Sequence, residues 1–486
     1  MLSIILQSVF FLVAACFAAY VLLELRMVSL SGKSAKKCLS MKGETDAFPK
    51  FESLPFVSVL LPIYNENELA RRLIYSVTGM DYPVDRLEII VLDDSSDSTT
   101  VLLQSIVKTY EARGVSIRLL RRENRIGYKA GNLIYGMRHA RGEFLAIFDA
   151  DCVPPRDFLL ETIPRFKDPN IGFLQTGISY MNRDASFLTM FQALEAGHQQ
   201  FVTVGLNSGG FMASLTGSSC VWRKACIEDI GGISAETITE DVDLGYRAQF
   251  KSWKYVYLRD VVSATELPTT MSAFRVQRER WARGLIQNAV RHIRAMLATP
   301  MSVAGRMYAV SLMFSSLFLA MFYLLVLLAL PLARLTASLG VLFDITCAVF
   351  LLTAIVWAGA NFVAGRQGAG LQRREPRLKL LTRSYAYVAM FFPLSLYYFY
   401  AAARVLAGKK GEFNPTPKGE NEALAKHPPI NAVLFLLEIL TLLYSLATLA
   451  NAAFMRNYWV CFFSFIVCSG FALALFLSLR ERSAKS

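Results

Sequence analysis

The chain of 486 residues is 54% hydrophobic and only 18% charged, below the ~25% of charged residues that is usual in soluble domains. Its net charge of +13 does not indicate a nucleic-acid partner, because no basic stripe with interleaved aromatic residues occurs between residues 50 and 300. The eight Cys and four His include no Cys-x-x-Cys pair and are scattered, so neither a zinc site nor a disulfide framework is predicted.

The first predicted element is a membrane helix in residues 1–25. Residues 2–23 carry no charge, and about 20 apolar residues suffice to cross a bilayer as a helix. A signal peptide is the alternative, which we disfavour because no basic region precedes the run and no small-x-small cleavage site follows it. Residues 26–54 are then expected to be a cytoplasmic linker.

Residues 55–300 are predicted to form a soluble α/β domain. Short apolar, β-branched runs alternate with helical stretches such as 66–80, which indicates a parallel sheet. The predicted strands are 56–61, 87–92, 115–120 and 144–148. A dinucleotide-binding domain is disfavoured, because the first strand is followed by "PIYNENEL" instead of a glycine-rich turn.

Polar residues follow three of these strands, where ligands bind in parallel sheets. They are Asn65 and Glu66, then Asp93 and Asp94, and finally Asp149 and Asp151. Two carboxylates in "FDADC" would bind a hard divalent cation, Mg²⁺ or Mn²⁺, together with a diphosphate. The alternative is a solvated turn that caps the next helix, but three acidic clusters at one sheet edge favour the metal.

The C-terminal part, residues 301–486, is predicted to hold membrane and interfacial helices. Spans are expected at 308–332, 341–364, 430–453 and 458–479. Residues 383–402 contain Pro393 and several Tyr, and aromatic residues favour the interface, so we expect an interfacial or re-entrant segment and five crossings. Lys and Arg cluster after the first, third and last span, which places the soluble domain in the cytoplasm and the N-terminus outside.

Seven motifs occur along the chain in the same order as in a known protein family. They are "VSVLLPIYNE", "VLDDSSDSTT", "ENRIGYKAGNL", "FDADCVPP", "LTGSSCVWR", "TEDVDLGYRA" and "QRERW". The set resembles family-2 inverting glycosyltransferases of the cellulose-synthase-like type, particularly the glucomannan and glucan synthase-like branch. The resemblance implies a GT-A type nucleotide-sugar-binding domain inserted between transmembrane helices.

The resemblance also implies roles for individual residues. Asp241 would be the general base that deprotonates the acceptor hydroxyl, with Glu240 beside it, while Asp243 would be structural. The metal at Asp149 and Asp151 would neutralise the leaving nucleoside diphosphate. The implied nucleotide-sugar-binding residues are Tyr64, Glu66, Asp93, Asp94, Lys129, Asp149 and Arg280. The implied acceptor-binding residues are Gln277, Trp281, Thr216 and Gly217.

Two motifs have simpler interpretations. "QRERW" is also typical of an amphipathic helix at the membrane surface, which is compatible with a catalytic role. Residues 410–420 contain "FNPTPKG", which resembles the family's gating loop over the donor site, with Pro415 where the family has Val. The alternative is a Pro/Gly-rich linker.

The leading hypothesis is a membrane enzyme that polymerises a β-linked polysaccharide from UDP-glucose or GDP-mannose and translocates it. A single transfer onto a lipid acceptor and an inactive membrane scaffold are the alternatives. The expected partners are a nucleotide sugar, a glycan or lipid acceptor and the lipid bilayer. The expected location is a plasma (inner) or Golgi membrane, depending on the source.

Overall fold

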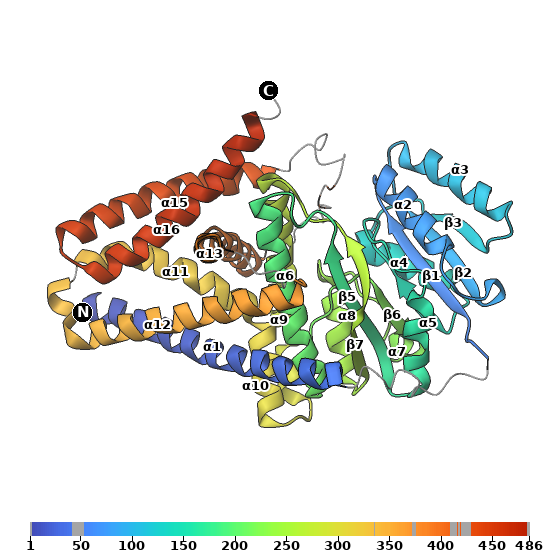
Figure 1. The fold of residues 1–486 in the computed structure, drawn as a ribbon, viewed down its shortest axis with the longest axis horizontal. Coiled ribbons are helices and arrows are strands. Elements are labelled where there is room, and N and C mark those ends of the chain that lie inside the picture. The colour runs from blue at the N-terminus through green and yellow to red at the C-terminus, as the bar shows by residue number, and fades with distance from the viewer. Residues whose placement is uncertain are drawn as a thin grey trace.

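The computed structural model describes residues 2–40, 53–334, 336–371, 376–408, 416, 418 and 429–483. Figure 1 shows an α/β domain at one end and a bundle of long apolar helices at the other. The helices α6 (Phe187–Ser208) and α9 (Met271–Ala298) lie between the two parts. The predicted arrangement, an α/β domain inserted between apolar helices, is confirmed.

The α/β domain is built on one seven-stranded sheet in the order β3-β2-β1-β4-β6-β5-β7. Its strands are β1 (Val57–Ile63), β2 (Leu87–Asp93), β3 (Ile117–Arg121), β4 (Phe144–Ile147), β5 (Ile171–Tyr180), β6 (Cys220–Arg223) and β7 (Lys254–Thr265). The four predicted strands are β1 to β4, and they pair in parallel. The sheet as a whole is mixed, because β6 is antiparallel to both β4 and β5.

Helices cover both faces of this sheet. One face packs against α2 (Asn67–Thr78), α3 (Thr99–Glu111) and α5 (Phe158–Thr162). The other face packs against α4 (Tyr128–His139), α7 (Lys224–Asp229) and α8 (Glu240–Phe250). Every residue of β1 is buried, as expected for a parallel strand covered on both sides. The two layers leave the carboxyl ends of the central strands open for a site.

Among the residues that the structure describes, the helical part comprises seven elements. They are α1 (Leu2–Ser40), α10 (Val303–Met313), α11 (Ser315–Arg334), α12 (Thr336–Gly368), α13 (Arg377–Leu406), α15 (Pro429–Phe454) and α16 (Tyr458–Ser483). Within the described residues, six helices are long and apolar enough to cross a membrane, judged by length and composition. They are Ile4–Ser34, Ser315–Arg334, Val341–Gly368, Arg377–Leu406, Asn431–Phe454 and Tyr458–Glu481.

Two helices have bounds that differ from the predicted segments. The first helix does not end at residue 25, because α1 continues to Ser40 and its Ser31 hydroxyl donates to the backbone of α6. The predicted span 308–332 is broken at Phe314. Its first part belongs to α10, which buries Ala309 and Met313 against α9.

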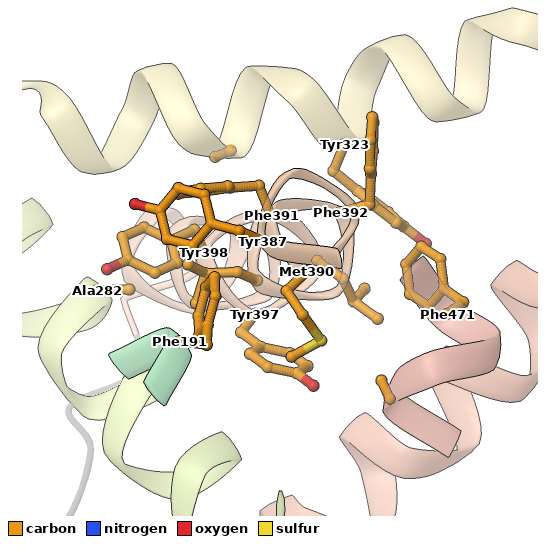
Figure 2. Close-up of a cluster of buried hydrophobic side chains, with 14 of the residues drawn as sticks. Phe191, Ala282, Tyr323, Tyr387, Met390, Phe391, Phe392, Tyr397, Tyr398 and Phe471 are labelled. Atoms are coloured by element: carbon orange, nitrogen blue, oxygen red, sulfur yellow. The ribbon is translucent and has the colours of Figure 1, made fainter. Parts of the chain in front are cut away.

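Helix α13 runs across the other apolar helices. Figure 1 shows it end-on, whereas α1, α12, α15 and α16 lie along the length of the molecule. Its side chains spread in all directions into a core of aromatic residues (Figure 2). Tyr387 and Phe391 contact Phe191 of α6, while Phe392 and Tyr323 of α11 lie in the same core on another side. Where α16 crosses α13, a Cβ on Gly470 would overlap the backbone of Ala389, so only glycine allows this approach.

Candidate active site

A pocket of about 210 Å³ lies beyond the carboxyl ends of the central strands, next to the start of α8 and one face of α9. The sequence-predicted residues that line it come from seven separate segments. They are Tyr64, Glu66, Asp94, Lys129, Asp149, Asp151, Thr216, Glu240, Asp241, Gln277, Arg280 and Trp281. Thr416 and Lys418, which fall within the predicted gating-like loop, also line it. The other residues of the segment 410–420 lie outside the described residues.

Two lysines face the aspartates of the "FDADC" motif. Lys129 of α4 places its Nζ 2.5 Å from Asp149 Oδ1, and the Lys418 ammonium pairs with the Asp151 carboxylate. Burial raises the pKa of Asp151, but the Lys418 charge and the hydrogen bonds from Lys418 and Thr265 together outweigh it, so this pKa is lowered. Burial would lower the pKa of Lys129, yet Asp149, Glu240 and Asp241 raise it, so this lysine stays charged.

The acids of "TEDVD" occupy the first turn of α8. Asp241 and Glu240 point to the pocket, and Lys129 Nζ lies 3.5 Å from Glu240 Oε1. Lys129 therefore bridges the two acidic motifs. Burial, with the Glu240 charge next to it, raises the pKa of Asp241 to about 7. A carboxylate with a pKa near neutrality is suited to take up a proton during a reaction.

Gly217 lies next to the Asp241 carboxylate and is not among the residues that line the pocket. Its φ is +77°, and a Cβ there would come closer to the carboxylate than real Cβ contacts do. Its carbonyl accepts a hydrogen bond from Lys129 Nζ at 3.3 Å. The neighbouring Thr216 lines the pocket, and its N–H donates to Gln175 Oε1. Of the two residues predicted to contact the acceptor here, the structure brings only Thr216 to the pocket.

Asp243 holds α8 in place, in line with the structural role expected for it. Its carboxylate is fully buried and accepts from Arg247 Nε at 2.7 Å, while His292 Nε2 of α9 lies 2.8 Å away. Asn288 of α9 donates to the Thr239 hydroxyl at 2.9 Å, directly before the first turn of α8. Two turns of α9 thus fix the helix that carries Asp241.

The "QRERW" motif lies on α9, whose successive residues point about 100° apart. Arg278 forms a bidentate pair with Glu195 of α6, both at 2.7 Å, and its guanidinium stacks on the Trp281 ring. Glu279 pairs with Arg404 of α13 at 3.2 Å. Arg280 points into the pocket and donates to Thr416 Oγ1 at 3.4 Å. Burial lowers the pKa of Arg280, while the surrounding acids, Glu240 first, oppose that effect.

The pocket also extends along the side of β1 and β2. The Arg125 guanidinium stacks 3.3 Å from the centre of the Tyr64 ring, and Arg122 holds Asp94 through two hydrogen bonds of 2.7 and 2.6 Å. Burial, with the Asp151 charge nearby, raises the pKa of Glu66 to about 8. This carboxyl therefore carries a proton at neutral pH in the substrate-free protein.

Asp93 differs from the prediction, because the structure does not bring it to the pocket wall. Its carboxylate is buried and accepts from the Ser95 N–H at 2.8 Å and the Thr100 hydroxyl at 2.7 Å. It shapes the turn after β2, and Asp94 is the residue of the pair that faces the pocket. Arg125 and Asn132 line the pocket but were not among the predicted site residues, although both stand in the "ENRIGYKAGNL" motif.

The paired aspartates have the donor chemistry that a hard divalent cation requires. Mg²⁺ is usually held by one or two carboxylates together with substrate phosphates, and Asp149 and Asp151 supply two carboxylates. In this structure each of them faces an ammonium group, so the pair already accommodates positive charge. Within the described residues no cluster of three or more His, Cys, Asp or Glu could hold a metal ion without further ligands.

Comparison with known proteins agrees with this geometry. The model of a glycosyltransferase like family 2 matches residues 55–284, the segment that contains the sheet, Asp149, Asp241 and Arg280. Residues 55–284 belong to glycosyltransferase family 2. The glycosyltransferase domain thus has a mixed, GT-A-like sheet, as the motifs implied.

Plant proteins are among the curated relatives of this glycosyltransferase domain. It is 38% identical over 239 residues to the probable glucomannan 4-beta-mannosyltransferase 9 of Oryza sativa subsp. japonica, a match that covers 48% of this chain and 45% of the relative. It is equally similar to glucomannan 4-beta-mannosyltransferase 2 of Arabidopsis thaliana, with the same coverage. The chain therefore spans a little less than half the length of these relatives.

Among solved structures, a mannosyltransferase from Pyrobaculum calidifontis in complex with GDP-Man and Mn²⁺ is similar to this chain at 19% sequence identity. The TM-score is 0.49, and the match covers 82% of this chain and all of the other.

Proposed function

We propose that this protein is a membrane-embedded inverting glycosyltransferase that transfers a hexose, with mannose from GDP-mannose as the first candidate, to the hydroxyl of a β-glycan. The position of Asp241, a buried carboxylate with a raised pKa in the same pocket as Lys129 and Arg280, carries the proposal. The names of the plant relatives support mannose, while UDP-glucose is the second candidate donor.

The proposed chemistry needs one base and a place for negative charge. Asp241 takes the proton of the acceptor hydroxyl while the hydroxyl oxygen attacks the anomeric carbon of the donor sugar. The bond from that carbon to the phosphate breaks, and the electron pair leaves with the nucleoside diphosphate. Arg280 and Lys129 then stabilise the diphosphate through charge-assisted hydrogen bonds. A divalent ion held by Asp149 and Asp151 would add positive charge to the same phosphates when bound.

The acceptor is proposed to lie along Gln277 and Trp281. Gln277 is buried in the pocket wall, and no donor among the described residues reaches its Oε1, so a sugar hydroxyl would satisfy this oxygen. The Trp281 ring is 38% exposed and is held by Arg278, which gives a flat surface for a sugar ring. These two contacts support a glycan acceptor and repeated transfer.

We also propose that the chain crosses the membrane five times, with α13 along the cytoplasmic surface. The chain on both sides of α13 contacts the catalytic domain. Before it, Arg259 of β7 donates to the carbonyl of Gln367 at the end of α12; after it, Lys418 pairs with Asp151. The crosswise direction of α13 in Figure 1 agrees with this proposal.

The test is to incubate the purified full chain with GDP-mannose and, separately, with UDP-glucose, and to measure GDP or UDP release beside product mass. The proposal expects nucleotide release with one donor, dependence on Mg²⁺ or Mn²⁺, and a ladder of added hexoses. Full activity in EDTA would refute the proposed role of a divalent ion at Asp149 and Asp151. A product with one hexose on a lipid would favour the single-transfer alternative, and no release with either donor would refute the donor assignment.

A further inference from the structure

A second cavity lies inside the helical part, apart from the candidate active site. It has a volume of about 120 Å³ and is bounded by α1, α11, α12, α13 and α16. Its wall is almost entirely apolar and includes Phe10, Leu325, Phe350, Phe391 and Phe463. It is therefore not a continuation of the charged pocket around Asp241.

The residues that line the cavity extend along the apolar helices α12 and α16. On α12 the lining residues run from Phe343 to Trp357, a stretch of about 21 Å at 1.5 Å per residue. On α16 they run from Trp459 to Ile466. Since the hydrocarbon core of a bilayer is about 30 Å thick, this length lies within one membrane crossing.

The chemistry of the wall excludes a sugar chain as the occupant. Three lining side chains carry a polar atom, namely Cys347, Trp357 and Trp459, and the Trp357 Nε1–H already donates to the Glu24 carboxylate at 2.5 Å. The Trp357 ring also packs edge-on against Phe391, with the ring centroids 4.9 Å apart. Sugar hydroxyls buried here would lose hydrogen bonds without replacement. Apolar cavities of about 150 Å³ in other proteins stay dry and take up apolar guests.

Exposed apolar side chains lie next to this cavity. Leu352 and Ile355 of α12 are 64% and 59% exposed, and Phe462 of α16, which lines the cavity, is 49% exposed. Helix α12 packs mainly on α1 and α6, whereas α16 packs mainly on α15 and α13. The seam between α12 and α16 thus gives a lipid chain a way in from the side.

We propose that this cavity binds one acyl chain of a bilayer phospholipid, which then packs between α12, α13 and α16 as part of the folded protein. The acyl chain would fill the space beside the crosswise helix α13, where helices that run in different directions cannot pack closely along their whole length. This inference does not depend on the proposed glycosyl transfer, and neither result decides the other.

The test uses the full chain in vesicles of phosphatidylcholine that carries a photoactivatable diazirine in the middle of one acyl chain. After illumination, labelled residues are mapped by mass spectrometry. We expect adducts on Leu325 and Phe391, which are only 4% and 8% exposed but line the cavity. Adducts on the exposed Leu352 report ordinary surrounding lipid. Labelled Leu352 without adducts on Leu325 and Phe391 would overturn the proposal.

A matched pair of variants separates a bound chain from chance contact. Ala354→Leu fills the cavity from α12, whereas Ala348→Leu adds the same side chain to an exposed position of the same helix. Ala354→Leu should reduce the interior adducts to the level of a dark sample while Leu352 stays labelled, and Ala348→Leu should leave both unchanged. If Ala354→Leu fails to fold, Ala329→Leu fills the cavity from α11. Interior adducts that persist in the filled cavity would refute the site.

Discussion

The candidate base Asp241 is defined by the groups that touch it. Burial and the adjacent Glu240 charge both favour its protonated form, while Lys129 favours the charged form. The balance leaves a raised pKa, so the residue can switch protonation state near neutral pH. For a carboxyl whose pKa is raised, the basic form is present above that pKa and is lost as the pH falls through it.

Replacing Asp241 with Asn should lower turnover by about 10²–10⁴-fold, the usual contribution of a general base. The amide keeps the shape of the side chain but cannot accept the proton, so donor binding should persist. In the wild type, kcat/KM should rise with pH through about 7, because only deprotonated Asp241 is active. The measurement is nucleotide release across pH 5–9; turnover of Asp241→Asn close to the wild type would transfer the role to another residue.

Gly217 offers a second prediction, because a side chain there would push the Asp241 carboxylate aside. Gly217→Ala should reduce kcat strongly while the protein still folds. Gly231→Ala is the matched control: Gly231 also has a positive φ, +83°, but nothing lies within 4 Å of the position of its Cβ. The Gly231→Ala control should lower the melting temperature through backbone strain but should leave kcat unchanged. Equal losses in both variants, measured with melting temperatures, would indicate strain alone.

Side-chain direction limited what the sequence could predict about the site. The acids after β1, β2 and β4 were predicted to meet because parallel strands end at one edge, and Glu66, Asp94, Asp149 and Asp151 do line one pocket. Sequence could not decide between Asp93 and Asp94, because successive residues at a strand end point to opposite sides. The partner of Arg278, Glu195, lies 83 residues away and gives no local signal.

At the scale of helices and strands, α9 connects the catalytic domain to the apolar helices. Its residues contact α8, α6 and α13, and its first turns reach α15, where Arg275 pairs with Glu438 through two hydrogen bonds of 2.6 Å. Asn431 and Ser478 bind the same guanidinium. The pair is fully buried, so its geometry ties the helix of "QRERW" to two C-terminal helices.

Breaking this pair should destabilise the protein more than removing it completely. Glu438→Leu leaves the Arg275 guanidinium buried without its carboxylate partner. Removing one partner of a buried pair typically lowers the free energy of unfolding by about 3–5 kcal/mol. The double variant Arg275→Met with Glu438→Leu should recover most of that loss. Melting temperatures of the purified chains test this. A double variant as unstable as Glu438→Leu would show that the loss does not come from the unpaired charge.

The elements themselves were predictable where the pattern is local. Strands β1 to β4 and the apolar helices have continuous apolar runs, which a parallel sheet and a membrane both require. The antiparallel strand β6 is only four residues long, and its place between β4 and β5 depends on pairing across distant parts of the chain. The crosswise helix α13 meets the same length and hydropathy criteria as the spans, so composition alone does not give its direction.

On the scale of the whole molecule, the direction of α13 decides on which side of the membrane the active site is completed. Thr416 and Lys418 follow α13 and contact the pocket, so the end of α13 must lie on the side of the catalytic domain. In Figure 1 the connection between α15 and α16 lies at the end of the helical bundle that is far from the catalytic domain. The five-crossing arrangement therefore predicts opposite accessibility for these two places.

Cysteine labelling measures this accessibility. Leu406→Cys at the end of α13 and Tyr458→Cys at the start of α16 both place a thiol at an exposed position, with exposures of 82% and 76% in the native residues. The native cysteines that the structure describes are buried or half-buried, so the background should be low. A membrane-impermeant maleimide applied to intact cells should label Tyr458→Cys at once and Leu406→Cys only after permeabilisation. If Leu406→Cys were labelled in intact cells and Tyr458→Cys were not, either α13 would cross the membrane or the whole orientation would be inverted, and both outcomes contradict the proposed arrangement. If both were labelled, the end of α13 and the start of α16 would lie on the same side of the membrane, so α15 would not cross it and the five-crossing arrangement would be refuted.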